Sequence, residues 1–160
     1  MKWLALLLPL VFAAPACHHP PSTPDAVMAA VKPVLDKELT RIGQAPKSVS
    51  ADEVARIAKP FDVSPQVHYL LQIEGKEAAL SVYYLGNEEA KTSPLILQLS
   101  KASGAEKDAG KPVAFHLHTH NKQAFFAHLA TSQGPDTGLQ NVLLQIFSPG
   151  AGTEIGKALK

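Results

Sequence analysis

Residues 67–84 alternate apolar and polar side chains with a period of two, and Gly75-Lys76 interrupts the alternation. This period is typical of β-strands with one buried face. A two-residue turn at Gly75-Lys76 would join two such strands into a hairpin. The resulting register pairs Glu74 with Glu77, Ile73 with Ala78, Leu71 with Leu80, and Tyr69 with Val82. It places the apolar residues on one face, as a stable hairpin requires. His68 lies on the other face, and we expect it to be a solvated strand residue.

Two helices are expected before this hairpin. The first begins after the cap residue Thr23, carries apolar residues at helical spacing, and ends near Gly43. Pro33 in its middle predicts a kink or a division into two short pieces. The second helix begins at Ser50, where Glu53 stands in the position of a capping box.

The rest of the chain predicts further short elements. They are expected in this order: a third strand over 95–99, a loop over 101–111, a second hairpin of 113–120 and 123–131 that turns at Asn121-Lys122, a closing helix over 139–146, and a loose tail over 149–160. A strand over 142–146 fits the closing segment as well. The predicted fold class is therefore α+β, an antiparallel meander of about five strands packed by N-terminal and C-terminal helices.

The first sixteen residues have the features of a secretory signal peptide. Lys2 gives a basic start, an apolar run covers residues 4–14, and small residues precede Cys17. The run is shorter than the roughly 20 apolar residues of a transmembrane helix. We therefore expect residues 1–16 to be cleaved, residues 17–23 to form a proline-rich stalk, and residues 24–148 to form a single domain.

Cys17 is the only cysteine of the chain. The segment Ala14-Pro15-Ala16-Cys17 resembles the lipobox of bacterial lipoproteins, with Ala14 where that motif usually has Leu. The resemblance implies that Cys17 is lipidated and anchors the protein to a membrane of the bacterial cell envelope. His18 at the next position then fits sorting to the outer membrane, with the domain in the periplasm. Simple secretion after cleavage at Ala16 is the alternative.

The charge of the exported part is balanced. Removing Lys2 from the 15 basic residues leaves 14, against 14 acidic residues in the chain. A neutral and interspersed surface argues against nucleic acid as a partner and against an electrostatic membrane patch.

A stripe of three histidines is the main candidate for chemistry. His116, His118 and His120 alternate along one predicted strand, so their side chains leave the same face. Imidazoles at this spacing can converge on one zinc or copper ion. The alternatives are an ordinary strand face, exposed or covered by part of a helix, and a pH response of clustered imidazoles.

His128 could add a fourth ligand only if the hairpin turn had three residues. With the two-residue turn Asn121-Lys122, Phe115 pairs with His128, and His128 points to the opposite face. We prefer the two-residue turn, which excludes His128 from the stripe.

The segment from Ala109 to His120 resembles, over about a dozen residues, the histidine-triad hydrolases, whose motif alternates three histidines with hydrophobic residues. The resemblance implies that His118 would be the nucleophile of a hydrolase. Thr119 and the pair Asn121-Lys122 depart from the motif, because that family keeps these positions apolar. A histidine-triad-like activity is therefore a remote alternative.

Other catalytic patterns, such as G-x-S-x-G, H-E-x-x-H or a glycine-rich phosphate loop, do not occur in the sequence. We expect a small lipid-anchored envelope protein that binds another envelope protein, as an inhibitor, an immunity protein or an assembly factor would. The predicted loops 86–93 and 101–112 are the expected contact surfaces, and an enzyme is the less favoured reading. The alternative is an envelope metal-binding protein that uses His116, His118 and His120. The sequence does not indicate an oligomeric state.

Overall fold

The computed structural model describes residues 19–88, 93–134 and 138–160. The signal peptide, Cys17 and His18 lie outside the described residues, as do residues 89–92 of the predicted contact loop 86–93. The elements follow in this order: α1 (Pro24–Arg41), β1 (Ser48–Val49), α2 (Ala51–Ala55), β2 (Gln66–Ile73), β3 (Lys76–Asn87), α3 (Pro94–Asp108), β4 (Val113–His120), β5 (Gln123–Thr131), α4 (Leu139–Ile146) and α5 (Pro149–Ala158).

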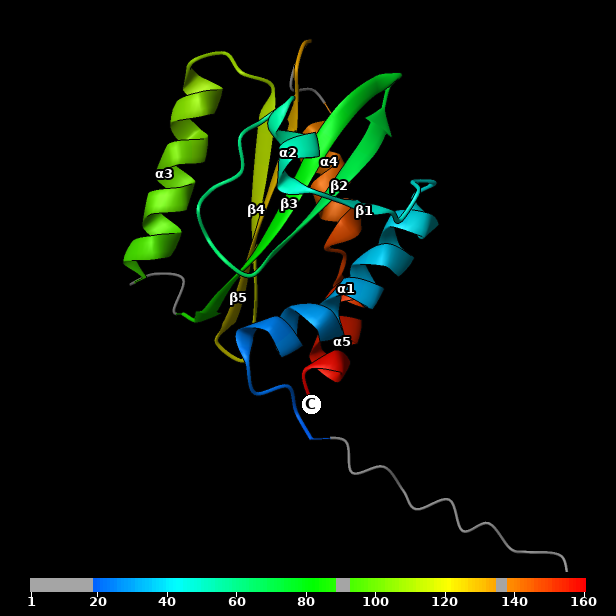
Figure 1. The fold of residues 1–160 in the computed structure, drawn as a ribbon, viewed down its shortest axis with the longest axis vertical. Helices are drawn as coiled ribbons and strands as arrows, with labels where there is room; N and C mark the ends of the chain where they lie inside the picture. The colour runs from blue at the N-terminus through cyan, green and yellow to red at the C-terminus, as the bar shows by residue number, and fades with distance from the viewer. Residues whose placement is uncertain (1–18, 89–92, 135–137) are drawn as a thin grey trace, which may run out of the picture.

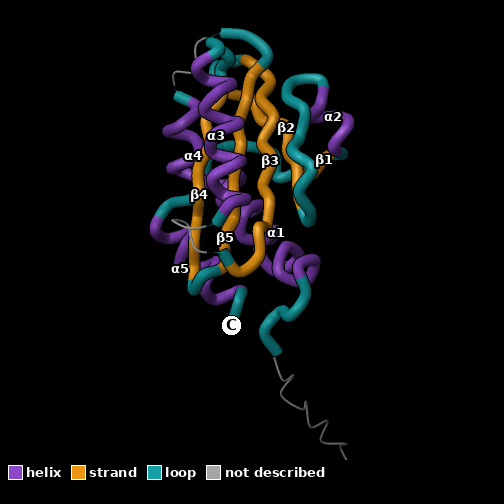
Figure 2. The backbone as a smooth tube through the Cα atoms, turned by 90° about the vertical axis from the view of Figure 1, so that its left-hand side faces the viewer, coloured by secondary structure: helices purple, strands orange, loops and turns teal. Residues whose placement is uncertain are grey.

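The fold is α+β, with a five-stranded antiparallel sheet between helices, as the sequence predicts. The strand order is β1-β2-β3-β5-β4, so the last hairpin joins the sheet through β5 and the sheet is not a simple meander. Helices α1, α4 and α5 cover one face, and α3 covers the other (Figure 1). Figure 2 shows β4 and β1 at the two opposite edges of the sheet.

The first hairpin is present, but its predicted register is wrong by two residues. The turn residues are Glu74 and Gly75, both with positive φ, and Ile73 pairs with Lys76. A pair of positive φ angles is what a tight two-residue hairpin requires, and Gly75 adopts it without a steric penalty. Because a shift of two residues preserves the side-chain alternation, the apolar face is unchanged.

Two segments differ more strongly from the sequence prediction. Residues 95–99 are not a strand, and residues 101–108 are not a loop, because both belong to helix α3. The expected tail over 149–160 contains helix α5, in which Ala151 and Ile155 are buried. The five-strand total is reached because the two-residue strand β1 takes the place of the predicted third strand.

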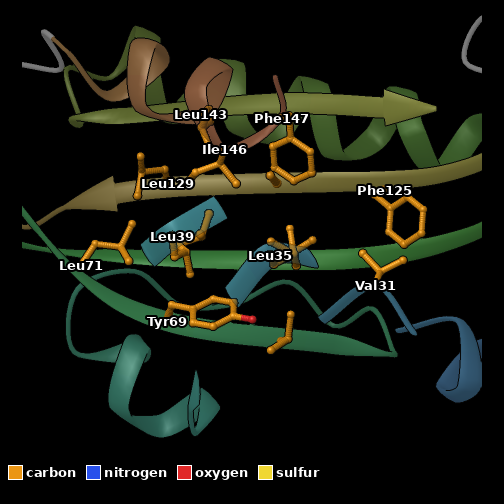
Figure 3. Close-up of a cluster of buried hydrophobic side chains, with 14 of the residues drawn as sticks. Val31, Leu35, Leu39, Tyr69, Leu71, Phe125, Leu129, Leu143, Ile146 and Phe147 are labelled. Carbon is orange, nitrogen blue, oxygen red and sulfur yellow. The ribbon is translucent and has the colours of Figure 1, made fainter. Parts of the chain in front are cut away.

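Helix α1 begins as predicted, with the Thr23 hydroxyl accepting a hydrogen bond from the backbone N–H of Ala26. It continues through Pro33 as one element rather than two, and it bends along its length (Figure 1). Its apolar residues pack on the sheet together with those of α4. Figure 3 shows this core, in which the labelled side chains from α1, β2, β5 and α4 meet: Val31, Leu35, Leu39, Tyr69, Leu71, Phe125, Leu129, Leu143, Ile146 and Phe147.

A second, smaller core lies on the other face of the sheet. It joins α3 to the chain between α2 and β2, and its buried members are Tyr83, Leu85, Ile96, Leu99, Ala124 and Phe126. Phe61 packs on this cluster, and its backbone N–H donates a hydrogen bond of 2.9 Å to the Tyr83 hydroxyl. Helix α2 carries the predicted capping box between Ser50 and Glu53. Both faces of the sheet are thus covered by other parts of the chain.

Candidate functional site

The histidine stripe lies on β4 and faces the helices α4 and α5. The hairpin turns at Asn121-Lys122 as predicted, and His116 pairs with Ala127 while His118 pairs with Phe125. Ala127 and Phe125 belong to the core under α1, α4 and α5. The three imidazoles therefore occupy the side of the strand that a helix layer covers.

Aromatic packing holds the first two histidines. The ring centroid of Phe147, at the end of α4, is 5.3 Å from that of His116 and 5.8 Å from that of His118. The ring of His118 is also 6.5 Å from that of Phe125. Its Nε2 atom is buried without a hydrogen-bond partner among the described residues. These contacts are those of half-buried side chains that pack against the helix layer.

Glycines in α5 allow this helix to approach the stripe closely. A Cβ atom on Gly152 would lie 3.1 Å from Cε1 of His118, and one on Gly156 would lie 2.5 Å from Cε1 of His120. Because any larger residue would collide with the imidazoles at the second position, the spacing Gly152-x-x-x-Gly156 is what lets α5 lie over the histidines. The residues 149–160 therefore complete the layer that covers the stripe.

The electrostatics of the stripe agree with this packing. Burial lowers the pKa of the His116 imidazole, and burial together with the neighbouring His116 and His120 lowers that of His118. Lowered pKa values keep the rings neutral at physiological pH, which is the form that packs on aromatic rings and the form that binds metals. Within the described residues, no group of three or more histidine, cysteine, aspartate or glutamate side chains is arranged to hold a metal ion.

A second polar cluster, which the sequence did not reveal, crosses the opposite face of the sheet. His68 on β2, Ser81 on β3 and His128 on β5 are directly opposite one another in neighbouring strands. A hydrogen bond of 2.8 Å joins Nδ1 of His68 to Oγ of Ser81. Nε2 of His128 donates a hydrogen bond of 2.8 Å to the carboxylate of Glu106 on α3. We call these four residues the buried polar row.

Three of the four residues of the polar row lie inside the protein, and Glu106 is partly exposed. His68, Ser81 and His128 are each only 4% exposed, so the prediction that His68 is solvated is wrong. The ring of Phe61 stands edge-on over His128, with the centroids 5.3 Å apart. Burial lowers the pKa of His68, and burial outweighs the opposing effect of Glu106 to lower that of His128. A serine hydroxyl that is covered in this way is not exposed to a substrate.

Two surface hollows flank this face. One of about 290 Å³ lies beside Glu106 and is lined by Lys59, Lys111 and Thr131 among others. The other, of about 390 Å³, lies between α2 and the start of β2 and includes Asp52. Neither hollow is lined by His68, Ser81 or His128, and Glu106 is the member of the polar row that lines the first hollow.

The two edges of the sheet differ in a way that bears on recognition. At the β2 edge, β1 pairs with His68 and Tyr69. Next to it, the side chain of Gln44 makes the hydrogen bonds that a neighbouring strand would make. Its amide N–H donates to the carbonyl of Gln72 and its amide oxygen accepts from the N–H of Gln72, each at 2.8 Å. Such coverings prevent an edge from pairing with other chains. The β2 edge is therefore covered at His68, Tyr69 and Gln72, and we call it the sealed edge.

At the other edge, no strand of the described residues pairs with β4 on its outer side. The N–H of Thr131 donates to the carbonyl of Pro112, and the hairpin turn follows His120, so the even-numbered residues of β4 direct their backbone groups to β5. The N–H and C=O groups of Phe115, Leu117 and Thr119 consequently point away from the sheet. None of these groups has a backbone partner among the described residues.

No family model, curated protein or solved structure matches this chain. Within the part of the chain that the structure describes, no helix combines the length and apolar character needed to cross a membrane.

Proposed function

We propose that this protein is a lipid-anchored protein of the bacterial cell envelope that binds another envelope protein, and that it does so by accepting an extended segment of that protein at the edge of β4. The export signal and the lipobox-like segment ending in Cys17 support the location. The open edge of β4 is the observation that carries the binding function.

Strand addition is the recognition mode that suits this edge. A peptide that pairs with a sheet edge gains main-chain hydrogen bonds, and side-chain contacts on the two faces provide its specificity. Residues 113–120 contain no Asp, Glu, Lys, Arg or Pro, so the strand lacks the residues that usually protect an edge. The side chains of Phe115 and Leu117 are only partly buried, so they can gain contacts with an added strand.

The contact surface differs from the one that the sequence suggested. Because residues 101–108 form the C-terminal half of α3, they present a helix surface instead of a mobile loop. The backbone of a helix is already hydrogen-bonded internally, and it cannot accept a strand. The edge of β4 therefore replaces the loop 101–112 as the proposed contact.

Site-specific photo-crosslinking in cells that produce the full chain tests the binding function. A photoreactive amino acid at Thr119 should crosslink to an envelope protein of distinct mass, whereas the same amino acid at Gln72, on the sealed edge, should not. Thr119→Pro removes an outward N–H and should abolish a crosslink formed from Leu117. Equal crosslinking from both edges, or none from β4, would contradict the proposal.

Metabolic labelling with a radioactive fatty acid tests the anchor separately. The wild-type chain should incorporate the label, and Cys17→Ser should not. Export of an unlabelled, soluble wild-type protein would instead support simple secretion.

A further inference from the structure

We infer that the edge of β4 also pairs with β4 of a second copy of this chain, antiparallel and about a two-fold axis at His116, so that two five-stranded sheets join into one continuous sheet. The inference rests on the same edge as the proposed function, and it names one occupant of that edge. A homodimer of this kind would hold the edge until another strand displaces the second copy.

The first argument is the self-complementary sequence of the strand. In antiparallel pairing about His116, Phe115 lies opposite Leu117 of the second copy, and Val113 lies opposite Thr119. Each pair thus joins residues that favour strands, and the apolar pair lies at the centre.

The register also suits the backbone. The odd-numbered residues direct their backbone groups outward, with the N–H of Val113 already donating to the carbonyl of Lys111, and this pairing matches odd-numbered residues with odd-numbered residues. Phe115 and Leu117 of each copy would exchange hydrogen bonds on both sides of the axis. Pairing about Leu117 would instead place Val113 opposite Asn121, which is in the turn of the hairpin. The register about His116 therefore uses the full length of the strand.

Charge does not oppose the association. Residues 113–120 carry no formally charged side chain at neutral pH, so antiparallel pairing brings no like charges together. In most edge strands such charges are what prevents pairing between identical molecules.

The helix beside the open edge offers additional apolar surface. Leu144 of α4 is 50% exposed and lies one turn before Phe147, on the same side of the helix. Phe147 packs on His116 and His118, so this side of α4 is the one that lies along β4. Leu144 and Leu97 on α3 are the large hydrophobic side chains that the described residues leave exposed, and both helices contact β4. A second copy at the edge would find apolar groups beside the paired strands.

Sedimentation velocity of the full chain carrying Cys17→Ser tests the inference, because this change removes lipid-driven association. We expect a concentration-dependent equilibrium between monomer and dimer. Thr119→Pro should weaken the dimer by about tenfold or more, because it removes one hydrogen-bond donor from each copy and the proline ring also obstructs the pairing. Thr119→Val keeps the N–H and the strand propensity, and it should dimerise like the parent.

Hydrogen exchange gives a residue-specific second readout. The amides of Phe115, Leu117 and Thr119 should exchange more slowly in the dimer than in the dilute monomer, and the amides of the sealed β2 edge should not change. A chain that stays monomeric at high concentration overturns the inference, and so does a dimer that Thr119→Pro leaves intact. A monomer that still crosslinks to another envelope protein from position 119 overturns the inference and leaves the proposed function standing. A dimer that forms no such crosslink supports the inference and contradicts the proposed function.

Discussion

The carboxylate of Glu106 on α3 accepts a hydrogen bond from the His128 imidazole on β5 across 2.8 Å, with 95% of the histidine side chain shielded from solvent. This hydrogen bond connects helix α3 to strand β5 inside the sheet. It also satisfies a polar atom that would otherwise be buried without a partner. Burying such an atom unpaired costs about 1–3 kcal/mol.

Glu106→Ala should therefore lower the free energy of unfolding by about 1–3 kcal/mol. Glu106→Gln keeps an oxygen acceptor and should cost less. Glu154→Ala is the matched control, because Glu154 is more exposed and its pair with Lys157 lies on the surface of α5, where such pairs contribute little. Chemical denaturation of the three variants measures the difference. Equal losses for Glu106→Ala and Glu154→Ala would contradict the structural role of the contact.

Acidification should destabilise the protein. Burial lowers the pKa of four histidines, His68, His116, His118 and His128, below their ordinary value of 6.5. Between the folded and unfolded pKa values the unfolded chain binds more protons, so the free energy of unfolding falls as the pH drops through 6.5. Above that pH these four histidines are neutral in both states, and their full contribution to the free energy of unfolding is present. Denaturation at several pH values between 5 and 8 should show this decline.

His118→Leu isolates one part of this effect. Because Nε2 of His118 is buried without a partner, replacing the ring by an apolar side chain should not reduce stability at pH 8 by more than about 1.5 kcal/mol, the range of swaps that nearly conserve volume. The variant should lose less stability than the wild type between pH 8 and pH 5. A variant that loses more stability on acidification than the wild type would show that His118 is not neutral in the folded protein.

The contact between α5 and the stripe predicts a specific intolerance to larger residues. A Cβ at Gly156 would lie 2.5 to 3.1 Å from three ring atoms of His120, so Gly156→Ala should destabilise the fold by about 1–3 kcal/mol, as overpacking does. Gly150→Ala meets only the Ser148 hydroxyl at 3.8 Å, and it should be neutral or stabilising because alanine favours helices. Thermal unfolding of both variants provides the measurement.

Removing the obstructing ring should reverse the loss. In the double variant Gly156→Ala with His120→Ala, the new methyl group has room, so the two changes should be less harmful together than their separate effects predict. Simple additivity would mean that the ring of His120 moves away from α5 at no cost.

The sequence revealed both hairpins because a period of two and a tight turn are local signals. It misplaced α3 because Leu95, Leu97 and Leu99 also alternate, and short apolar runs fit either a strand or a helix. A capping signal was nevertheless present. Ser93-Pro94 begins α3 and Ser148-Pro149 begins α5 in the same way that Thr23-Pro24 begins α1, with the hydroxyl accepting a hydrogen bond from the third residue beyond it.

The buried polar row could not be read from the sequence. His68, Ser81 and His128 become neighbours only when the registers of three strands are known, and a register error of two residues would separate them. Glu106 lies on the segment that the sequence assigned to a loop. The stripe of His116, His118 and His120 was visible because it lies on one strand, but its cover of α4 and α5 depends on contacts between distant segments.

This cover gives the metal hypothesis a sharp test. To bind one zinc ion, the imidazoles of His116 and His118 would have to leave the ring of Phe147, and His120 would have to leave its place beside Gly156. The lost packing would be subtracted from the binding energy, so we expect no submicromolar one-to-one site on β4 and no rise in melting temperature with zinc or copper.

Calorimetric titration of the full chain with His18→Ala and His19→Ala, which removes the adjacent pair in the stalk, measures the stripe alone. The triple variant His116→Ala, His118→Ala, His120→Ala should then bind no more weakly than this parent. Tight binding that the triple variant loses would contradict the prediction, and it would mean that α5 moves off the sheet to admit the ion.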